Sequence, residues 1–454
     1  MKNTDVLVIG GSAAGLVAAL TGKSVYPDKK FTVIAKEENT LIPCGIPYTF
    51  ASVDGTDCNI LPSNKMFENA NIDLLIGKVT SIDPENKTCI LENKDEISFG
   101  KLVLATGSTP TIPEWLIGAN LENVFTVPKN KNYLDLMRSR LNQCNRIVVI
   151  GAGFIGVELS DELNKKGKEI ILIEKLPHIL GLCFDEEISI RAEQVLTENG
   201  VILKTGTGVK ELSGNKKVEK VILENGEVID TDAVVLSMGY QPNTELAKES
   251  GISTSKQGCI KVDEYMRTES PDIFAVGDCA QKHDFITRKA CCIMLASTAC
   301  AEARIAGINL FKLSAIKTFS GTISIFSTMI GDTGFGVAGI TEAQAKKEGF
   351  EIITGTFEGI DKHPGTLNGA KKQLVKLIVG KESSVILGGE VVGGSSAGEL
   401  TNIIGIIIQN RMNINSILTS QIGTHPLLTA SPAGYPLLKA AGNAASRTIY
   451  NHVA

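Results

Sequence analysis

Three kinds of residue in this sequence could do chemistry: an isolated cysteine, two glycine-rich turns and a few histidines. Cys44 lies between two prolines in TLIPCGIPY, residues 40–48. A thiolate is a nucleophile that can be oxidised reversibly, and flanking prolines restrict the backbone that carries it. The ten cysteines form neither the CxxC pairs of a zinc site nor a dense disulfide scaffold, so no metal site is predicted and most should be reduced and packed. They are Cys44, Cys58, Cys89, Cys144, Cys183, Cys259, Cys279, Cys291, Cys292 and Cys300.

The turn GAGFIG has the full spacing of a dinucleotide-binding motif. Gly151, Gly153 and Gly156 follow the apolar segment RIVVI and precede a helical pattern. Such glycines allow a tight turn, a close approach of a pyrophosphate to the backbone, and packing of helix on strand. Glu174 ends the next strand, where a carboxylate would bond an adenosine ribose hydroxyl and repel a 2′-phosphate. This arrangement favours NADH over NADPH, although Lys175 beside it acts against that preference.

The N-terminal turn GGSAAG follows the same plan with a departure. Gly10 and Gly15 keep their places, but Ser12 stands where the middle glycine is expected. The next strand, residues 30–37, ends in Ala-Lys-Glu, so the acid comes two positions late. Glu37 is therefore either a replacement for the ribose-binding carboxylate or a surface acid.

Three more apolar segments finish at glycines, as strands of a nucleotide-binding sheet do. They are KLVLATGSTP (101–110), VVLSMGYQPN (234–243) and DIFAVGDCA (272–280). The first and third suit a second nucleotide that passes across the strand ends of the N-terminal domain. Asp278 would then bond a polyol chain or a phosphate-linked water.

These elements predict an α/β protein with two Rossmann-like dinucleotide-binding domains and a C-terminal α+β domain. From about residue 320 the pattern changes: residues 373–394 predict an antiparallel hairpin, and 397–411 and 413–420 predict helices. The expected domains are 1–112 with 250–318, then 113–249, then 319–454.

The amino-acid composition argues against two classes of binding partner, nucleic acids and anionic membranes. The 454 residues are 43% hydrophobic and 21% charged, with a net charge of −5 and no basic cluster, which argues against nucleic acid or an anionic membrane as partner. The N-terminus runs directly into a strand without the pattern of a secretory signal, and the longest apolar stretch, 403–408, is too short to span a bilayer. We expect a cytoplasmic protein.

Six motifs together carry a resemblance to a known family. GGSAAG, PCGIPY, ATGSTP, GAGFIGVE, VGDCA and LASTA (295–299) occur in this order over essentially the whole chain. In this the chain resembles the FAD-dependent pyridine nucleotide-disulfide oxidoreductases. It is most similar to their single-cysteine branch, which holds coenzyme A disulfide reductases, NADH-dependent persulfide reductases, and NADH oxidases and peroxidases.

The resemblance implies FAD in the first domain, NADH or NADPH in the second, and a homodimer formed by the third, which completes the neighbouring subunit's site. It implies that Asp278 holds the ribityl and phosphate region and that Phe154 is an aromatic gate over the flavin. The full set of expected cofactor contacts is Gly10, Ser12, Ala14, Gly15, Lys36, Glu37, Val79, Ala105, Thr106, Gly107, Gly151, Gly153, Phe154, Ile155, Gly156, Glu158, Glu174, Lys175, Gly239, Gly277, Asp278 and Ala296.

The resemblance also implies that Cys44 is the redox thiol, at the start of a helix against the flavin. A helix N-terminus would lower the pKa of this thiol and supply a thiolate. Thr49 stands where the two-cysteine relatives have a second cysteine, so Cys44 would cycle through a mixed disulfide, a persulfide or a sulfenic acid.

The C-terminal domain departs from the coenzyme A disulfide reductases, whose two tyrosine segments are replaced here by KHPG (362–365) and GTHPLLTASP (423–432). The second is closer to the histidine segment of dihydrolipoamide dehydrogenases and glutathione reductases. His425 is thus a candidate acid/base, although Ala430 replaces the glutamate that orients such a histidine, and His363 is a second candidate. Both could equally be structural. Cys291 and Cys292, just before LASTA, either relay electrons or pack.

The function expected from these residues is transfer of electrons from NAD(P)H through FAD and Cys44 to a low-molecular-weight disulfide, persulfide or polysulfide, possible derivatives of coenzyme A among them. An NADH oxidase or peroxidase, with oxygen or peroxide as acceptor, would use the same motifs. A reductase of a small redox protein is the third alternative.

Overall fold

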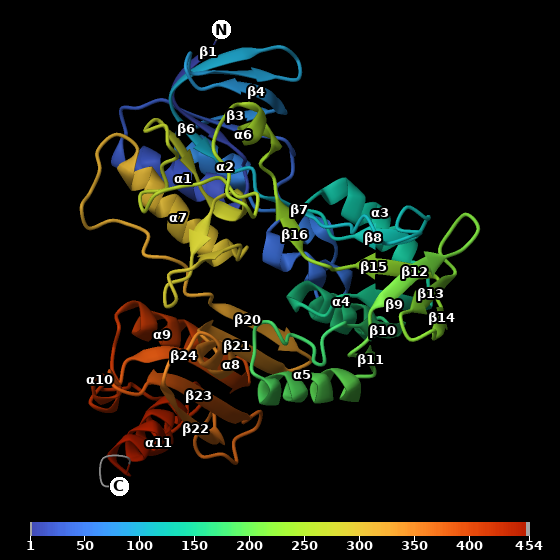
Figure 1. The fold of residues 1–454 in the computed structure, drawn as a ribbon, viewed down its shortest axis with the longest axis vertical. Coiled ribbons are helices and arrows are strands. Elements are labelled where there is room, and N and C mark those ends of the chain that lie inside the picture. The colour runs from blue at the N-terminus through green and yellow to red at the C-terminus, as the bar shows by residue number, and fades with distance from the viewer. Residues whose placement is uncertain (1, 451–454) are drawn as a thin grey trace.

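The computed structural model describes residues 2–450 (Figure 1). The chain is built around three large β-sheets, each with helices packed beside it. Two of the sheets are built on parallel strands and the third is antiparallel, so the predicted α/β class with an α+β C-terminal part is confirmed. None of the described helices is both long and apolar enough to cross a membrane.

The first sheet has the strand order β3-β2-β1-β6-β5-β4, with β17 added beside β6. The four pairings around its centre are parallel, and β4, β5 and β6 pair antiparallel. The strands are β1 (Lys2–Ile9), β2 (Phe31–Ala35), β3 (Asp73–Ile76), β4 (Val79–Asp83), β5 (Thr88–Leu91), β6 (Glu96–Leu104) and β17 (Ile273–Ala275).

Helices α1 (Ala13–Val25) and α7 (Ala296–Asn309) pack against each other in this domain, together with α2 (Ser63–Asn69). Figure 1 shows that yellow-orange α7 returns to blue α1 although more than half of the chain separates them. The first sheet therefore needs segments from two parts of the sequence. Short 3-10 helices η1 (Pro43–Gly45), η2 (Pro47–Phe50), η3 (Thr56–Asn59) and η4 (Gly277–Cys279) lie in its loops.

The second sheet is fully parallel, with the order β11-β10-β9-β15-β8. Its three central strands, β10, β9 and β15, are almost uninterrupted runs of buried aliphatic residues, as expected for strands covered on both faces. The elements are β8 (Val124–Thr126), α3 (Lys131–Asn142), β9 (Arg146–Ile150), α4 (Phe154–Lys165), β10 (Glu169–Ile173), α5 (Glu186–Glu198), β11 (Ile202–Lys204) and β15 (Ala233–Leu236).

Smaller elements lie in the segments that join the strands and helices of these two sheets. A three-stranded antiparallel sheet contains β12 (Val209–Ser213), β13 (Lys220–Leu223) and β14 (Val228–Asp230). The pair β7 (Ser108–Pro110) and β16 (Tyr240–Pro242) forms one crossing between domains, followed by α6 (Glu245–Glu249). The pair β18 (Lys282–His283) and β19 (Ala290–Cys291) precedes α7.

The third sheet is antiparallel, with the order β20-β21-β24-β23-β22. The predicted hairpin at 373–394 is confirmed as β23 and β24, and the two predicted helices are confirmed as α9 and α10. The elements are β20 (Phe326–Ile330), β21 (Thr333–Gly339), α8 (Glu342–Lys347), β22 (Ile352–Ile360), β23 (Lys372–Gly380), β24 (Ile386–Gly393), α9 (Ala397–Gln409), α10 (Ile414–Leu418), η5 (Pro432–Gly434) and α11 (Pro436–Tyr450). The domain boundaries stay a prediction.

Candidate functional site

The N-terminal glycine turn joins β1 to α1 and leaves no space for side chains. Gly10 has a φ of +117°, and a Cβ there would lie 2.1 Å from the carbonyl oxygen of Ala105. A Cβ on Gly15 would lie 1.8 Å from the carbonyl oxygen of Gly10, and one on Gly277 would lie 2.9 Å from the Cβ of Ala14. The strands β1, β6 and β17 are parallel neighbours. The structure therefore brings the predicted residues Gly10, Ala14, Gly15, Ala105 and Gly277 together at the C-terminal ends of these strands.

The second glycine turn joins β9 to α4 in the same way. Gly151 has a φ of +96°, and a Cβ on Gly156 would lie 1.9 Å from the carbonyl oxygen of Gly151. By contrast, a Cβ on Gly153 would meet nothing within 4 Å. Two glycines of the motif thus serve packing of the helix on the strand, whereas the middle one faces open space.

Glu174 is held beside this turn by two backbone amides. Its Oε2 accepts a hydrogen bond from the N–H of Ala152 at 2.7 Å, and its Oε1 accepts one from the N–H of Leu176 at 2.8 Å. The side chain of Glu174 is therefore held beside the GAGFIG turn, where it was expected to bond the ribose of the nucleotide. Lys175 is exposed and pairs with Glu224 at 3.2 Å, away from this carboxylate.

The N-termini of α1 and α4 have the properties that phosphate binding requires. Their N-cap residues, Ser12 and Gly153, make no side-chain cap hydrogen bond, and neither helix has an acidic residue in its first turn. Free amide groups at the positive end of a helix dipole attract anions. Both turns fit the pyrophosphate of a dinucleotide.

The remaining predicted cofactor residues lie in different surroundings: some are hydrogen-bonded, one is buried and others are exposed or open. Glu37 accepts a hydrogen bond from Asn130 Nδ2 at 2.8 Å, and Thr106 donates one to the carbonyl of Asn243 at 2.6 Å. Val79 is buried in β4 at the far edge of the sheet. Lys36 is exposed, and the Cβ positions of Gly107 and Gly239 are open. Ile155 lies in the first turn of α4, and Ala296 begins α7. The contacts of all these residues with a cofactor stay predictions.

Asp278 lies in η4, directly after β17, and is engaged by two side chains. Its Oδ2 accepts hydrogen bonds from Ser108 Oγ at 2.7 Å and from Lys129 Nζ at 2.8 Å. Burial acts to raise the pKa of Asp278, but the Lys129 ammonium and the two hydrogen bonds outweigh burial and lower it. Asp278 is therefore a carboxylate, and no sequence pattern pointed to its partner Lys129.

Cys44 lies in η1, and the residue is exposed. Asn59 holds this turn, because its Nδ2 donates to the carbonyl of Ile42 at 3.0 Å, and a Cβ on Gly45 would collide with its Oδ1. Thr49, in η2, is buried and donates to the carbonyl of Ile46 at 2.7 Å. The segment is thus two short 3-10 turns, whereas the sequence predicted a helix beginning at the thiol.

A cluster of three polar side chains lies next to Cys44. Thr328 Oγ1 of β20 donates to Glu158 Oε1 of α4 at 2.8 Å, and the Tyr48 hydroxyl hydrogen-bonds to both Glu158 and Thr328. Burial raises the pKa of Glu158 to about 7, although the hydrogen bonds from Thr328 and Tyr48 act to lower it. Three domains of the chain therefore meet at a carboxyl group that titrates near neutral pH.

The predicted lowering of the Cys44 pKa is wrong for the protein chain. Removal of water by the surrounding protein raises the pKa of the Cys44 thiol, the Glu158 carboxylate raises it further, and Lys129 opposes both. A single 3-10 turn offers only a small dipole, so it cannot offset these two effects. Sequence analysis missed Tyr48 and Thr328; Tyr48 stands four residues after Cys44 in the same motif, but nothing in the sequence places Thr328 there.

Phe154, the expected gate, begins α4 and packs against a C-terminal strand. Its ring stacks on Phe326 of β20, with centroids 5.0 Å apart and planes 8° from parallel, and meets Phe184 edge-on at 6.0 Å. Any movement of the Phe154 ring would break this stacking. Its position is compatible with a gate, and that role stays a prediction.

The two candidate histidines lie together in the C-terminal domain. His363 Nδ1 donates to the carbonyl of Thr429 at 3.0 Å, and its backbone N–H donates to the carbonyl of Pro426 at 3.1 Å. His425 is exposed, and its Nδ1 accepts from the N–H of Leu427 at 3.3 Å. The KHPG and GTHPLLTASP segments thus form one surface, and the contacts that the structure gives to these two rings are all within that surface.

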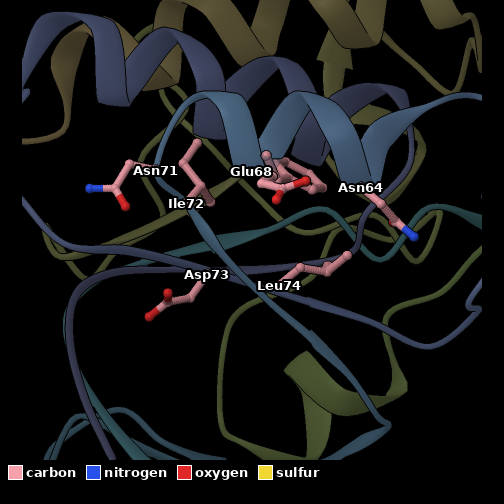
Figure 2. Close-up of a pocket in the computed structure, with 7 residues that line it drawn as sticks. Asn64, Glu68, Asn71, Ile72, Asp73 and Leu74 are labelled. Atoms are coloured by element: carbon pink, nitrogen blue, oxygen red, sulfur yellow. The ribbon is translucent and has the colours of Figure 1, made fainter.

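Two surface pockets lie apart from these residues. One is lined by α2 and β3, with Asn64, Glu68 and Asp73 at its rim (Figure 2). The other lies between α5 and the C-terminal sheet, near Arg191 and Lys371. Neither is lined by a predicted site residue. The candidate site comprises Cys44, the carboxyl groups of Glu158 and Asp278, whose charges raise its pKa, and the two glycine turns.

The family of the chain follows from comparison with known proteins. Residues 4–303 match the pyridine nucleotide-disulphide oxidoreductase family, and residues 325–433 match the dimerisation domain of the same family. The chain therefore belongs to the pyridine nucleotide-disulphide oxidoreductases. It is an oxidoreductase of the NAD(P)H-dependent, FAD-containing kind.

Individual relatives cover most of the chain. It is 29% identical over 425 residues to an NADH oxidase of Methanocaldococcus jannaschii, covering 90% of this chain and 92% of the relative. It is 31% identical over 399 residues to a CoA-dependent NAD(P)H sulfur oxidoreductase of Pyrococcus furiosus, covering 87% and 89%. The solved NAD-dependent persulfide reductase of A. fulgidus matches with a TM-score of 0.90 at 29% identity, over 99% of this chain and 84% of that one. By name, these relatives are an oxidase, a sulfur oxidoreductase and a persulfide reductase.

Proposed function

We propose that this enzyme passes electrons from NAD(P)H through FAD and Cys44 to a low-molecular-weight disulfide, persulfide or polysulfide. The observation that carries the proposal is the Cys44 thiol itself, exposed in a held turn and next to Glu158, which titrates near pH 7. The sulfur-reducing relative from P. furiosus and the persulfide reductase from A. fulgidus support the same acceptor class.

The chain's own residues would hold the cofactors as follows. The α1 turn with Gly10 and Gly15 would bind the FAD pyrophosphate, and Asp278 would accept hydrogen bonds from its polyol chain. The α4 turn would bind the NAD(P)H pyrophosphate, and Glu174 would bond the adenosine ribose. A bound flavin with NAD(P)H supplies the two-electron chemistry that side chains lack.

Cys44 would act as the nucleophile toward the sulfur acceptor. Its thiolate attacks one sulfur of a substrate disulfide, forms a mixed disulfide and releases the other half as a thiolate. Glu158, half-protonated near pH 7, would take the thiol proton and give it to a departing thiolate. Desolvation and the Glu158 charge raise the pKa of Cys44, so transfer of the thiol proton to a base would accompany the attack.

The C-terminal domain would form a homodimer, as its match to a dimerisation domain indicates. In that arrangement the exposed ring of His425, and the half-buried ring of His363, would approach Cys44 of the partner subunit. His363 donates through Nδ1, so its Nε2 is left to exchange a proton with a leaving thiol.

An NADH oxidase is the second candidate, favoured by the relative from M. jannaschii. Cys44 would then pass through a sulfenic acid, and oxygen or peroxide would be the acceptor. The two candidates share every residue named above and differ only in what reaches Cys44.

The experiment that tests the proposal is anaerobic NADH oxidation with a panel of acceptors. Coenzyme A disulfide, glutathione disulfide, lipoamide, polysulfide and glutathione persulfide are compared in the wild type, in Cys44→Ser and in Cys58→Ser. Cys58 is also an exposed cysteine and serves as the matched control. We expect one sulfur acceptor to turn over in the wild type and in Cys58→Ser and to fall to background in Cys44→Ser.

Two outcomes contradict the sulfur-reductase proposal. Undiminished sulfur turnover in Cys44→Ser removes Cys44 from the reaction. No sulfur turnover, combined with NADH consumption restored by air or peroxide, establishes the oxidase instead.

A further inference from the structure

A second pair of thiols lies outside the candidate site. The Sγ atoms of Cys259 and Cys292 are 3.5 Å apart, so one thiol is within hydrogen-bonding reach of the other, although 33 positions separate them in sequence. Cys259 lies in the loop between α6 and β17, and Cys292 follows β19 on the way to α7. Sequence analysis left Cys292 open between relaying electrons and packing, and it gave Cys259 no role.

The two thiols differ in access and in freedom to move. Cys259 is 1% exposed and is held in a tight turn, because its N–H donates to Ser255 Oγ at 3.3 Å and its carbonyl accepts from the N–H of Ser255 at 2.7 Å. Cys292 is exposed and lies in the irregular segment between β19 and α7. A reagent can therefore reach Cys292 first, with Cys259 directly behind it.

The surroundings of Cys259 favour the protonated form of its thiol. Burial raises the pKa of Cys259, and the neighbouring Cys292 sulfur raises it further. The Lys282 ammonium opposes this increase. Its Nζ is held by the carbonyls of Gly277 at 2.6 Å and Ala280 at 3.0 Å. Cys259 thus remains a thiol until its neighbour becomes activated.

We propose that Cys259 and Cys292 are a second redox site, which forms a reversible intramolecular disulfide when the enzyme meets a low-molecular-weight disulfide. The Cys292 thiolate attacks one sulfur of R–S–S–R, which forms a Cys292–S–S–R bond and releases one RS⁻. Cys259 then loses its proton and attacks the Cys292 sulfur, which releases the second RS⁻ and closes the Cys259–Cys292 bond. Two protein thiols are oxidised, one disulfide is reduced to two thiols, and both protons end on the leaving thiolates.

This inference goes beyond the proposed function, because it needs neither NAD(P)H nor Cys44. The new bond would tie the turn of Cys259 to the segment that leads into α7. Ala296, the first residue of α7, is a predicted flavin contact and lies only four positions after Cys292. Oxidation of this pair would therefore restrict the segment that leads into α7, while the two glycine turns keep their structure.

The test is thiol trapping in glutathione buffers of increasing glutathione disulfide content, without NADH. The flavin-loaded full-length wild type, Cys292→Ser, Cys259→Ser and Cys300→Ser are quenched with acid, alkylated and mapped by mass spectrometry under non-reducing conditions. We expect a peptide linked through Cys259 and Cys292 in the wild type and in Cys300→Ser, reversed by excess reduced glutathione. Cys259→Ser should instead accumulate a glutathione mixed disulfide on Cys292.

Two results overturn the inference, and both are read from the wild type, so they do not depend on the variants folding. In the first, both cysteines remain fully alkylated in buffers where the exposed Cys58 already carries glutathione. In the second, Cys292 carries glutathione but no linked peptide forms. Failure of Cys44 in the turnover experiment leaves this result unaffected, so the two proposals fail separately.

Discussion

At the scale of single residues, the thiol proposed to react and the carboxyl group proposed as its acid/base partner affect each other's ionisation. The proposed attack on sulfur requires Cys44 as a thiolate, yet its surroundings and the Glu158 carboxylate raise its pKa. Glu158 is itself shifted to a pKa of about 7 by burial, so near neutral pH it holds a proton part of the time. The two groups share one electrostatic environment, and a change at either must alter the other.

Replacing Glu158 by Gln should increase the reactivity of Cys44. Removing the negative charge lowers the pKa of the thiol, and a shift of one pKa unit corresponds to about tenfold in thiolate fraction at a fixed pH. The rate of Cys44 alkylation by iodoacetamide, followed against pH in the protein without NADH, measures this pKa. An alkylation profile identical to that of the wild type would show that Glu158 does not act on Cys44.

The same carboxyl group makes a pH-dependent contribution to stability. The folded pKa of Glu158, about 7, is raised above its ordinary value of 4.5, so the folded state binds more protons between these values. This contribution is fully present below pH 4.5, and the free energy of unfolding loses it as pH rises through 7. We expect Glu158→Gln to remove that part of the decline, measured by urea unfolding at several pH values. Glu302, buried with a pKa of about 7, contributes a similar decline that this variant should leave in place.

At the scale of elements, both nucleotide units are a buried parallel strand, a glycine turn and a helix. The glycines divide into those that permit packing and those that face open space. In the second unit Gly156 belongs to the first group and Gly153 to the second. The physical difference is whether a methyl group would collide with the protein or with a ligand.

Alanine at Gly156 should therefore mainly reduce the stability of the fold, whereas alanine at Gly153 should mainly weaken nucleotide binding. Gly156→Ala forces a Cβ against a backbone carbonyl and should destabilise the fold by at least about 2 kcal/mol. Gly153→Ala adds a methyl group to open space and should cost less than about 1 kcal/mol, but should weaken NADH binding. Thermal unfolding and NADH titration of both variants separate the two effects. Equal destabilisation by the two substitutions would contradict this assignment.

At the scale of the whole molecule, α4 and the segment before α5 join the domains. On α4, Phe154 stacks on Phe326 and Glu158 accepts from Thr328, both in β20. Glu162, one turn further, accepts two hydrogen bonds from Ser52, in the segment that follows Cys44. The C-terminal sheet thus contacts the same helix that positions Glu158, so the geometry of the thiol site depends on the docking of the third domain.

A buried lysine fixes that docking. Lys376 of β23 is within 2.8 Å of Asp185, 2.5 Å of Glu187 and 2.9 Å of Glu342, and its side chain is only 3% exposed. Asp185 also accepts from the backbone N–H groups of Glu342 and Ala343 at the start of α8. The positive charge therefore joins the middle domain to the C-terminal domain through carboxylates from both.

Lys376→Met should destabilise the protein by about 3–5 kcal/mol, because it leaves the buried Asp185 carboxylate without its cation. Lys381→Met removes an exposed pair with Glu351 and should change the free energy of unfolding by about 1 kcal/mol or less. Denaturant unfolding of both variants at one pH makes the comparison. A similar small effect for the two lysines would mean that the docking does not depend on this charge.

The sequence by itself determined the repeated strand–turn–helix units, the C-terminal hairpin and helices, and the family, since each depends on local patterns of apolar residues and glycines. It also singled out Cys44, and the family resemblance named Glu158 as an expected cofactor contact. Only the tertiary structure decided that Tyr48 and Thr328 surround Glu158, that Lys129 pairs with Asp278, and that Cys259 faces Cys292. These contacts join residues that are 33 to 280 positions apart, so no local pattern could predict them. The direction of the Cys44 pKa shift was mispredicted for the same reason, because removal of water by the surrounding protein and a carboxylate far away in sequence, rather than the local turn, set it.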